Sequence, residues 1–79
     1  SKNQKTKIEM FVINKVREKR RALRMSQEDI ALILNVSRGF IGQVESPDSP
    51  EKYNLNHLNT LALEFNCSPK DFLPDNGIS

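Results

Sequence analysis

Arg38 and Gln43 are the side chains of this sequence best suited to make paired hydrogen bonds to a flat partner. They lie in the segment 38–45, where Ile41 and Val44 supply the apolar positions of a short helix. An arginine can donate two hydrogen bonds to O6 and N7 of guanine, and a glutamine can pair with N6 and N7 of adenine. On an arbitrary helix both side chains usually face solvent, so this interpretation depends on the motif around them.

Basic residues are concentrated at the N-terminal end of the chain. Residues 1–24 contain nine Lys or Arg and two Glu, a net charge of +7, whereas the rest contains three basic and eight acidic side chains, a net charge of −5. Such a block suits a polyanion such as DNA, although a solvated lysine-rich face explains the composition equally well.

Catalytic and metal-binding chemistry has little support in the sequence. His57 and Cys67 are the single histidine and the single cysteine, too few for the four ligands of a zinc finger, and Cys67 suits a small buried apolar position. The sequence shows no paired acid and base and no phosphate-binding loop. We therefore expect neither an enzyme nor a cofactor.

Length and composition indicate one small globular domain. The chain has 79 residues, 37% hydrophobic and 28% charged. No apolar run approaches the ~18 residues of a transmembrane helix, and the basic N-terminus lacks the apolar stretch of a signal peptide. We expect a cytoplasmic protein with a basic flexible arm or cloning remnant at residues 1–7, a folded domain at 8–74 and a frayed tail at 75–79.

Apolar residues recur at helical spacing throughout, and strand-like alternation is missing. The pattern predicts an all-α domain of five helices, over about 7–23, 27–34, 38–45, 55–65 and a short segment near 69–73. Phe11, Val12, Val16 and Leu23 form the apolar stripe of the first helix. Leu55, Leu58, Leu61, Ala62 and Phe65 form that of the fourth, which we expect to pack in the core.

The ends of the predicted helices carry recognisable signals. Ser26 with Asp29 matches a capping box, and Ser37 is a good N-cap for the third helix. Asn35 tolerates the left-handed conformation that often ends a helix. One helix therefore stops and the next begins within three residues, and a proline-containing surface loop follows at 46–54.

This arrangement resembles the Xre/Cro family of phage-repressor-type helix-turn-helix domains over about residues 12–73. The resemblance rests on Arg20, the segments MSQEDIA (25–31) and LNVS (34–37), Ile41, Val44, Glu45 and the later pattern from Leu61 to Leu73. It implies a five-helix lambda-repressor-like DNA-binding domain whose second and third helices form the helix-turn-helix. It also implies a homodimer on double-stranded DNA, with the fourth and fifth helices as the usual dimer surface.

The family resemblance assigns roles to individual residues. Arg20 and Glu45 are expected to pair and to hold the third helix against the first. The third helix is expected to enter the major groove with Arg38, Gly39, Gly42 and Gln43 on its outward side, Arg38 and Gln43 reading bases. The expected phosphate contacts are those of Gln27, Ser37, Lys19, Arg21, Arg24 and Lys52.

The sequence departs from the family in two places. Gly39 and Gly42 each cost about 1 kcal/mol in a helix relative to alanine and offer no side chain for readout. They let the helix sit deep in a groove or let another backbone or Phe40 pack closely, and the sequence does not decide between these. Leu32 and Ile33 occupy outward positions that the family usually fills with polar residues, and with Phe40 they form an apolar patch. We expect Ile8 and Phe11 to cover it, and a dimer or partner-protein surface is the alternative.

Two functions are therefore compared. Sequence-specific DNA binding by a prokaryotic or phage transcriptional regulator is favoured by the basic block, Gln27, Arg38 and Gln43. A protein-interaction module, such as the antitoxin component of a toxin-antitoxin pair, is favoured by the glycines and by the patch of Leu32, Ile33 and Phe40. RNA binding is disfavoured because the few aromatic residues are mostly assigned to the core.

Overall fold

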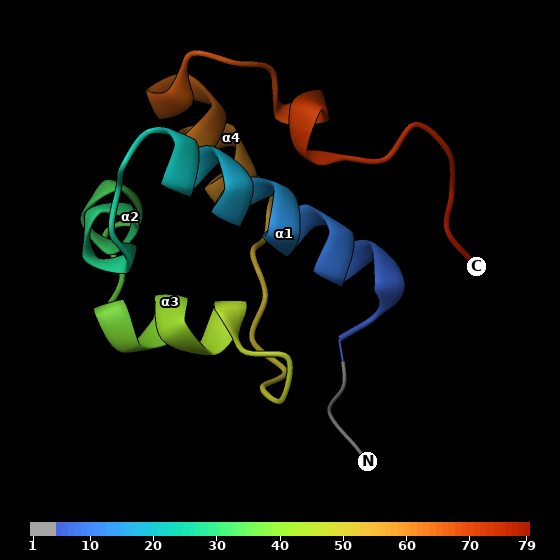
Figure 1. Cartoon of the computed structure of the whole chain (residues 1–79), viewed down its shortest axis with the longest axis horizontal. Helices are drawn as coiled ribbons and strands as arrows, with labels where there is room; N and C mark the ends of the chain where they lie inside the picture. The colour runs from blue at the N-terminus through green and yellow to red at the C-terminus, as the bar shows by residue number, and fades with distance from the viewer. Residues whose placement is uncertain (1–4) are drawn as a thin grey trace.

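The computed structural model describes residues 5–79 as four α-helices followed by one turn of 3-10 helix (Figure 1). The elements are α1 (Lys7–Ala22), α2 (Gln27–Leu34), α3 (Arg38–Glu45), α4 (Leu55–Phe65) and η1 (Pro69–Phe72). No strand occurs within the described residues. This part of the chain is all-helical, and none of its helices combines the length and apolar character that crossing a membrane requires.

The predicted fifth helix is wrong, because η1 is a single 3-10 turn. Ser68 caps this turn and Pro69 begins it. The backbone N–H of Leu73 donates to Lys70 O at 3.0 Å, a bond to the third preceding residue. Pro74 follows immediately and has no N–H to donate, so the segment between the two prolines is too short for an α-helical ladder.

The N-terminus of each α-helix is fixed by a side chain just before it. Thr6, Ser26 and Asn54 each form a reciprocal capping box with the residue three positions later, and Ser37 accepts a hydrogen bond from Phe40 N at 3.0 Å. The caps predicted at Ser26 and Ser37 are confirmed. These caps satisfy amides that a helix start leaves without partners.

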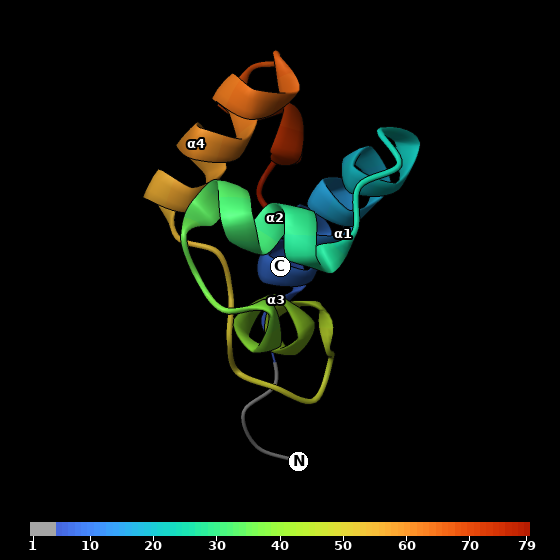
Figure 2. The ribbon, with the colours of Figure 1, turned by 90° about the vertical axis from the view of Figure 1, so that its left-hand side faces the viewer.

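The turn between α2 and α3 is as short as the sequence predicts. Asn35 has φ 58° and ψ 47°, the left-handed conformation, and ends α2. Ser37 then caps α3 only two residues later. Figure 2 shows α2 lying above α3, which is seen nearly end-on, and the turn runs down from the left-hand end of α2 to the near end of α3. The short turn therefore restricts how far the two helices can move relative to one another.

The end of α1 is closed by a Schellman-type pair of hydrogen bonds. Met25 N donates to Arg20 O at 2.9 Å, and Arg24 N donates to Arg21 O at 3.0 Å. Arg24 itself has φ 58°, the left-handed conformation. Glycine is the usual residue at this position because it has no Cβ to clash in the left-handed region. Arg24 therefore occupies a backbone conformation that its own side chain disfavours.

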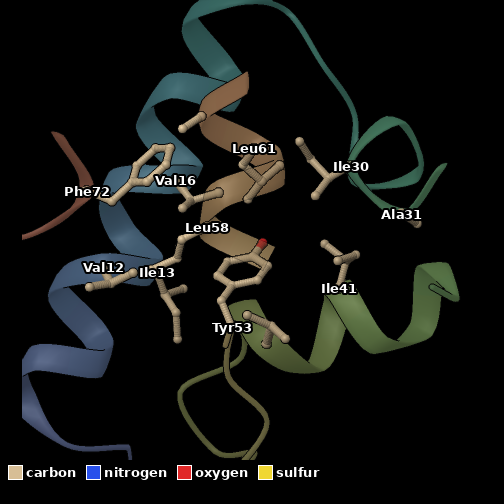
Figure 3. Packing of buried hydrophobic residues seen from close by; sticks show 12 residues of the cluster. Val12, Ile13, Val16, Ile30, Ala31, Ile41, Tyr53, Leu58, Leu61 and Phe72 are labelled. Carbon is tan, nitrogen blue, oxygen red and sulfur yellow. The ribbon is translucent and has the colours of Figure 1, made fainter. Parts of the chain in front are cut away.

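The core is built from residues of every element (Figure 3). Its fully buried side chains are Ile13, Val16, Ile30, Ile41, Val44, Leu61 and Phe72. Those labelled in Figure 3 point from α1, α2, α3, α4 and η1 toward a common centre; they are Ile13, Val16, Ile30, Ile41, Leu61 and Phe72. Both α2 and α3 bury one side in this core, and the opposite side of α3 therefore faces outward.

Two leucines assigned to apolar stripes by their spacing are not core residues. Leu55 is 80% exposed and Leu23 is 50% exposed. Both lie at helix ends, Leu55 in the first turn of α4 and Leu23 at the C-cap of α1. Leu63, eight residues after Leu55 and on roughly the same side of α4, is 76% exposed. The outer side of α4 is thus partly apolar.

Candidate nucleic-acid interface

Glu45, the last residue of α3, is the centre of a buried polar network. Both Glu45 and Arg20 of α1 are 8% exposed. Arg20 Nε donates to Glu45 Oε2 at 3.0 Å, and Arg20 Nη2 donates to Oε1 at 2.9 Å. Arg20 Nη1 also donates to Met25 O at 3.0 Å. This pair connects α1, the segment between α1 and α2, and the end of α3.

Two further side chains complete the network. Arg17 Nη2 donates to the backbone carbonyl of Glu45 at 2.7 Å, and Arg17 Nε lies 3.6 Å from Glu45 Oε1. Gln27 Nε2 donates to Glu45 Oε1 at 3.0 Å. The sequence analysis missed Arg17, although its place one turn before Arg20 on the same face of α1 is a signal for it. Gln27 is therefore tied to α3 through Glu45.

Much of the basic N-terminal block serves the fold. Besides Arg17 and Arg20, Lys15 lies 4.0 Å from Glu18 and over the ring of Phe11. Lys5 is buried against backbone carbonyls. The net charge of the segment therefore exceeds the charge that its surface offers to a partner. Of the predicted phosphate contacts in α1 and the turn after it, Arg21 and Arg24 are exposed and Lys19 is partly buried.

The outward side of α3 carries the residues predicted to read bases. Arg38, Gly39 and Gln43 are exposed and Gly42 is partly buried. At helical spacing these residues share one face. Figure 1 shows α3 along the lower edge of the molecule. Arg38 and Gln43 thus flank a strip of surface without side chains.

Neither glycine of α3 is required by the packing of the protein itself. Both have ordinary negative φ angles. A Cβ added at Gly39 would lie 3.9 Å from Ser37 Oγ, and one added at Gly42 would lie 3.8 Å from Gln27 Oε1. These are ordinary van der Waals distances, so a close approach by another element of the described chain does not explain the glycines.

Three other predicted phosphate-binding residues are engaged within the chain. Ser37 Oγ accepts the Phe40 amide at α3. Lys52 Nζ lies 2.7 Å from Glu9 Oε2, and this bond lowers the pKa of the Glu9 carboxyl. Gln27 gives its side-chain amide to Glu45. Gln27 is also the first residue of α2, where backbone N–H groups lack helical partners.

Tyr53 of the loop before α4 and His57 of α4 form an aromatic contact beside α3. Tyr53 is 9% exposed, and its hydroxyl has no hydrogen-bond partner among the described residues. Burial, and next the Glu45 carboxylate, raise the pKa of the Tyr53 hydroxyl. The ring of His57 lies 6.0 Å from that of Tyr53 and 5.8 Å from that of Phe40. Tyr53 thus connects the loop to α4, and His57 connects α4 to Phe40 of α3.

The apolar patch expected on α2 and α3 is reduced to one residue. Ile33 and Phe40 are partly buried and pack on the core, whereas Leu32 is 74% exposed. The expected cover by Ile8 and Phe11 is wrong. Ile8 lines a small groove with Tyr53 and other residues of α1 and α4, and Phe11 borders a hollow beside η1. Both side chains lie in the N-terminal half of α1, where they face this groove and this hollow instead of α2.

Comparison with known proteins finds no matching family model, no matching curated protein and no matching solved structure. The resemblance to a helix-turn-helix family therefore rests on the sequence motifs alone.

Proposed function

We propose that this chain is a sequence-specific double-stranded DNA-binding domain, a prokaryotic or phage transcriptional regulator of the Xre/Cro type. In this proposal α2 and α3 form the helix-turn-helix of a lambda-repressor-like domain, and α3 enters the major groove. The protein acts in the cytoplasm as a homodimer that reads two half-sites about one helical turn apart.

The observation that carries the proposal is the outward face of α3. Arg38 and Gln43 are exposed on it, and each suits a bidentate contact to one base, worth about 1 to 3 kcal/mol of discrimination. Gly39 and Gly42 lie between them without a packing reason in the fold. Close approach of a partner to the helix backbone is one purpose for which glycine is used. A major groove that receives α3 supplies such a partner.

Phosphate contacts in this proposal come mainly from the α1–α2 side. The first amides of α2, at Gln27 and Glu28, lie at the positive end of the helix dipole, where a phosphate is favoured. Because the Gln27 side chain already donates to Glu45, its backbone N–H is the better phosphate donor. Arg21 and Arg24 are exposed nearby on α1 and the following turn.

Selection from a randomised duplex library at near-physiological salt tests the proposal. The wild-type protein is expected to enrich a roughly palindromic site, and the double variant Arg38→Ala with Gln43→Ala to lose it. A matched control, Asn14→Ala with Lys7→Ala, removes one amide and one charge from exposed positions of α1. It is expected to enrich the same site as the wild type.

The alternative function is a protein-interaction module, such as an antitoxin component. It is favoured by the exposure of Leu32, at 74%, and of Leu55 and Leu63 on α4. DNA binding that is weak, salt-sensitive and equal in the wild type and the Arg38 and Gln43 variant would reject sequence-specific readout. Such a result would leave the protein-interaction module as the better account of these leucines.

A further inference from the structure

Lys5 makes a contact that the sequence gave no reason to expect. Its ammonium donates to the backbone carbonyl of Gln43 at 3.3 Å and also to those of Ser46 and Ser49. The residue is only 9% exposed. An ammonium has three donors and no acceptor, so three carbonyl oxygens satisfy it completely. The carbonyls come from the last turn of α3 and from the chain just after it.

The end of α3 lacks the left-handed C-cap residue that ends α2 and α4. Asn35 and Asn66 end α2 and α4 in the left-handed conformation, whereas Ser46 after α3 is extended, with φ −84° and ψ 129°. The last carbonyls of a helix have no helical partners and form the negative end of its dipole. At α3, Gln43 O accepts Ser46 N at 3.1 Å and Ser46 O accepts Ser49 N at 3.4 Å. Lys5 adds a charged donor to both carbonyls, and Arg17 donates to that of Glu45 at 2.7 Å.

The charges around Lys5 also favour this position. Burial lowers the pKa of Lys5, and the carboxylates of Glu51, Glu9 and Asp48 oppose that change. Two of these acids lie in the loop after α3. Lys5 is therefore complementary in charge to these two acids of the loop, although Lys52 of the same loop opposes it.

We propose that Lys5 is a positioning residue for α3, whose ammonium fixes the end of this helix and so the orientation of its outward face. The inference rests on the proposed function in so far as α3 is the part that meets DNA. Lys5 touches no DNA itself in this proposal and acts only through the three carbonyls.

Lys5→Met tests the inference because it keeps an apolar stem of similar length and removes the ammonium. In the free protein we expect faster hydrogen exchange at the C-terminal amides of α3 and at residues 46–49, with unchanged exchange in α4. We also expect affinity for the selected duplex to fall about tenfold, as for the loss of hydrogen bonds to a charged group. Lys7→Ala, an exposed position two residues later, removes the same charge and is expected to change neither measurement more than about twofold.

Chemical rescue separates an ammonium site from ordinary packing. In Lys5→Ala, added propylammonium, which replaces the part of the lysine side chain beyond Cβ, is expected to restore the exchange protection of α3 and the affinity. Tetramethylammonium at the same ionic strength cannot donate hydrogen bonds and is expected to restore neither. Circular dichroism confirms beforehand that each variant is helical, and Lys5→Met carries the test if Lys5→Ala does not fold.

The possible results separate this inference from the proposed function. Wild-type exchange at α3 and wild-type affinity in Lys5→Met would overturn the role of Lys5, as would equal rescue by both cations. If the wild-type protein selects no duplex, the proposed function fails, while the exchange and rescue measurements still decide whether Lys5 holds α3.

Discussion

Glu45 and Arg20 face one another as two planar groups, with Arg20 Nε 3.0 Å from Glu45 Oε2 and Arg20 Nη2 2.9 Å from Oε1. The pair lies between α1 and α3 and is shielded from water on most sides. Burying two charges is costly unless they are paired and hydrogen-bonded. The Glu45 carboxylate also accepts a hydrogen bond from Gln27. Removal of this carboxylate therefore affects α1, α2 and α3 together.

Glu45→Ala is expected to lower the free energy of unfolding by about 3 kcal/mol or more, because it leaves the Arg20 guanidinium buried without its partner. Urea unfolding followed by circular dichroism measures the loss. Glu64→Ala, on the exposed side of α4, is the control and should stay within about 0.5 kcal/mol of the wild type. A Glu45→Ala loss in that same small range would show that the pair does not hold α3.

Gly39→Ala and Gly42→Ala should each stabilise the free protein, by up to about 1 kcal/mol, because alanine is the better helix former and its methyl group meets no close contact. The same methyl groups would separate α3 from a bound duplex. We therefore expect stability to rise while affinity for the selected site falls. Parallel urea unfolding and duplex titration measure the two effects, and an affinity that rises with stability would remove the glycines from the interface.

Arg24→Gly is a second case in which stability and binding should change in opposite directions. Glycine at φ 58° avoids the clash of a Cβ, so we expect a gain of about 0.5 to 1 kcal/mol in the free energy of unfolding. Loss of the guanidinium should weaken binding to all sequences alike and reduce the salt dependence by about one phosphate contact. Unchanged salt dependence would show that Arg24 does not meet the DNA backbone.

The features predicted correctly from the sequence depend on neighbouring residues. Ser26, Asn35 and Ser37 end or begin helices through contacts with residues at most four positions away. Such signals are present in a short window of sequence. They were enough to place α2, α3 and the turn between them, and therefore the outward face of Arg38 and Gln43.

The features that were missed depend on residues far apart in the chain. Lys5 meets Ser49 across 44 positions, and Arg17 meets Glu45 across 28. No spacing rule connects such pairs. Leu55 shows the opposite error, because helical periodicity assigned it to the core although it lies 80% exposed at a helix end. Packing partners, which periodicity does not contain, decide which residues of an apolar stripe are buried.

Tyr53→Phe is expected to leave the stability unchanged or to raise it by about 1 kcal/mol. The hydroxyl is buried without a partner among the described residues, and a buried polar group without a hydrogen bond costs free energy. The phenyl ring keeps the contact with His57. Thermal and urea unfolding measure the change. A loss above about 1 kcal/mol would mean that the hydroxyl is hydrogen-bonded in solution.

His57 should make the stability of the protein depend on pH. Its Nδ1 accepts the Asn54 amide at 3.1 Å in the cap of α4, which requires an unprotonated nitrogen, and burial lowers its pKa. The unfolded chain gains a proton near pH 6.5, before the folded protein does. Stability is therefore fully present above about pH 6.5 and is lost as the pH falls through the lower pKa of the folded state. Urea unfolding between about pH 7.5 and about pH 5 should show this decline. His57→Gln keeps a capping acceptor without titrating in that range, so its stability should vary less with pH, and an equal decline in both proteins would assign the effect to other groups.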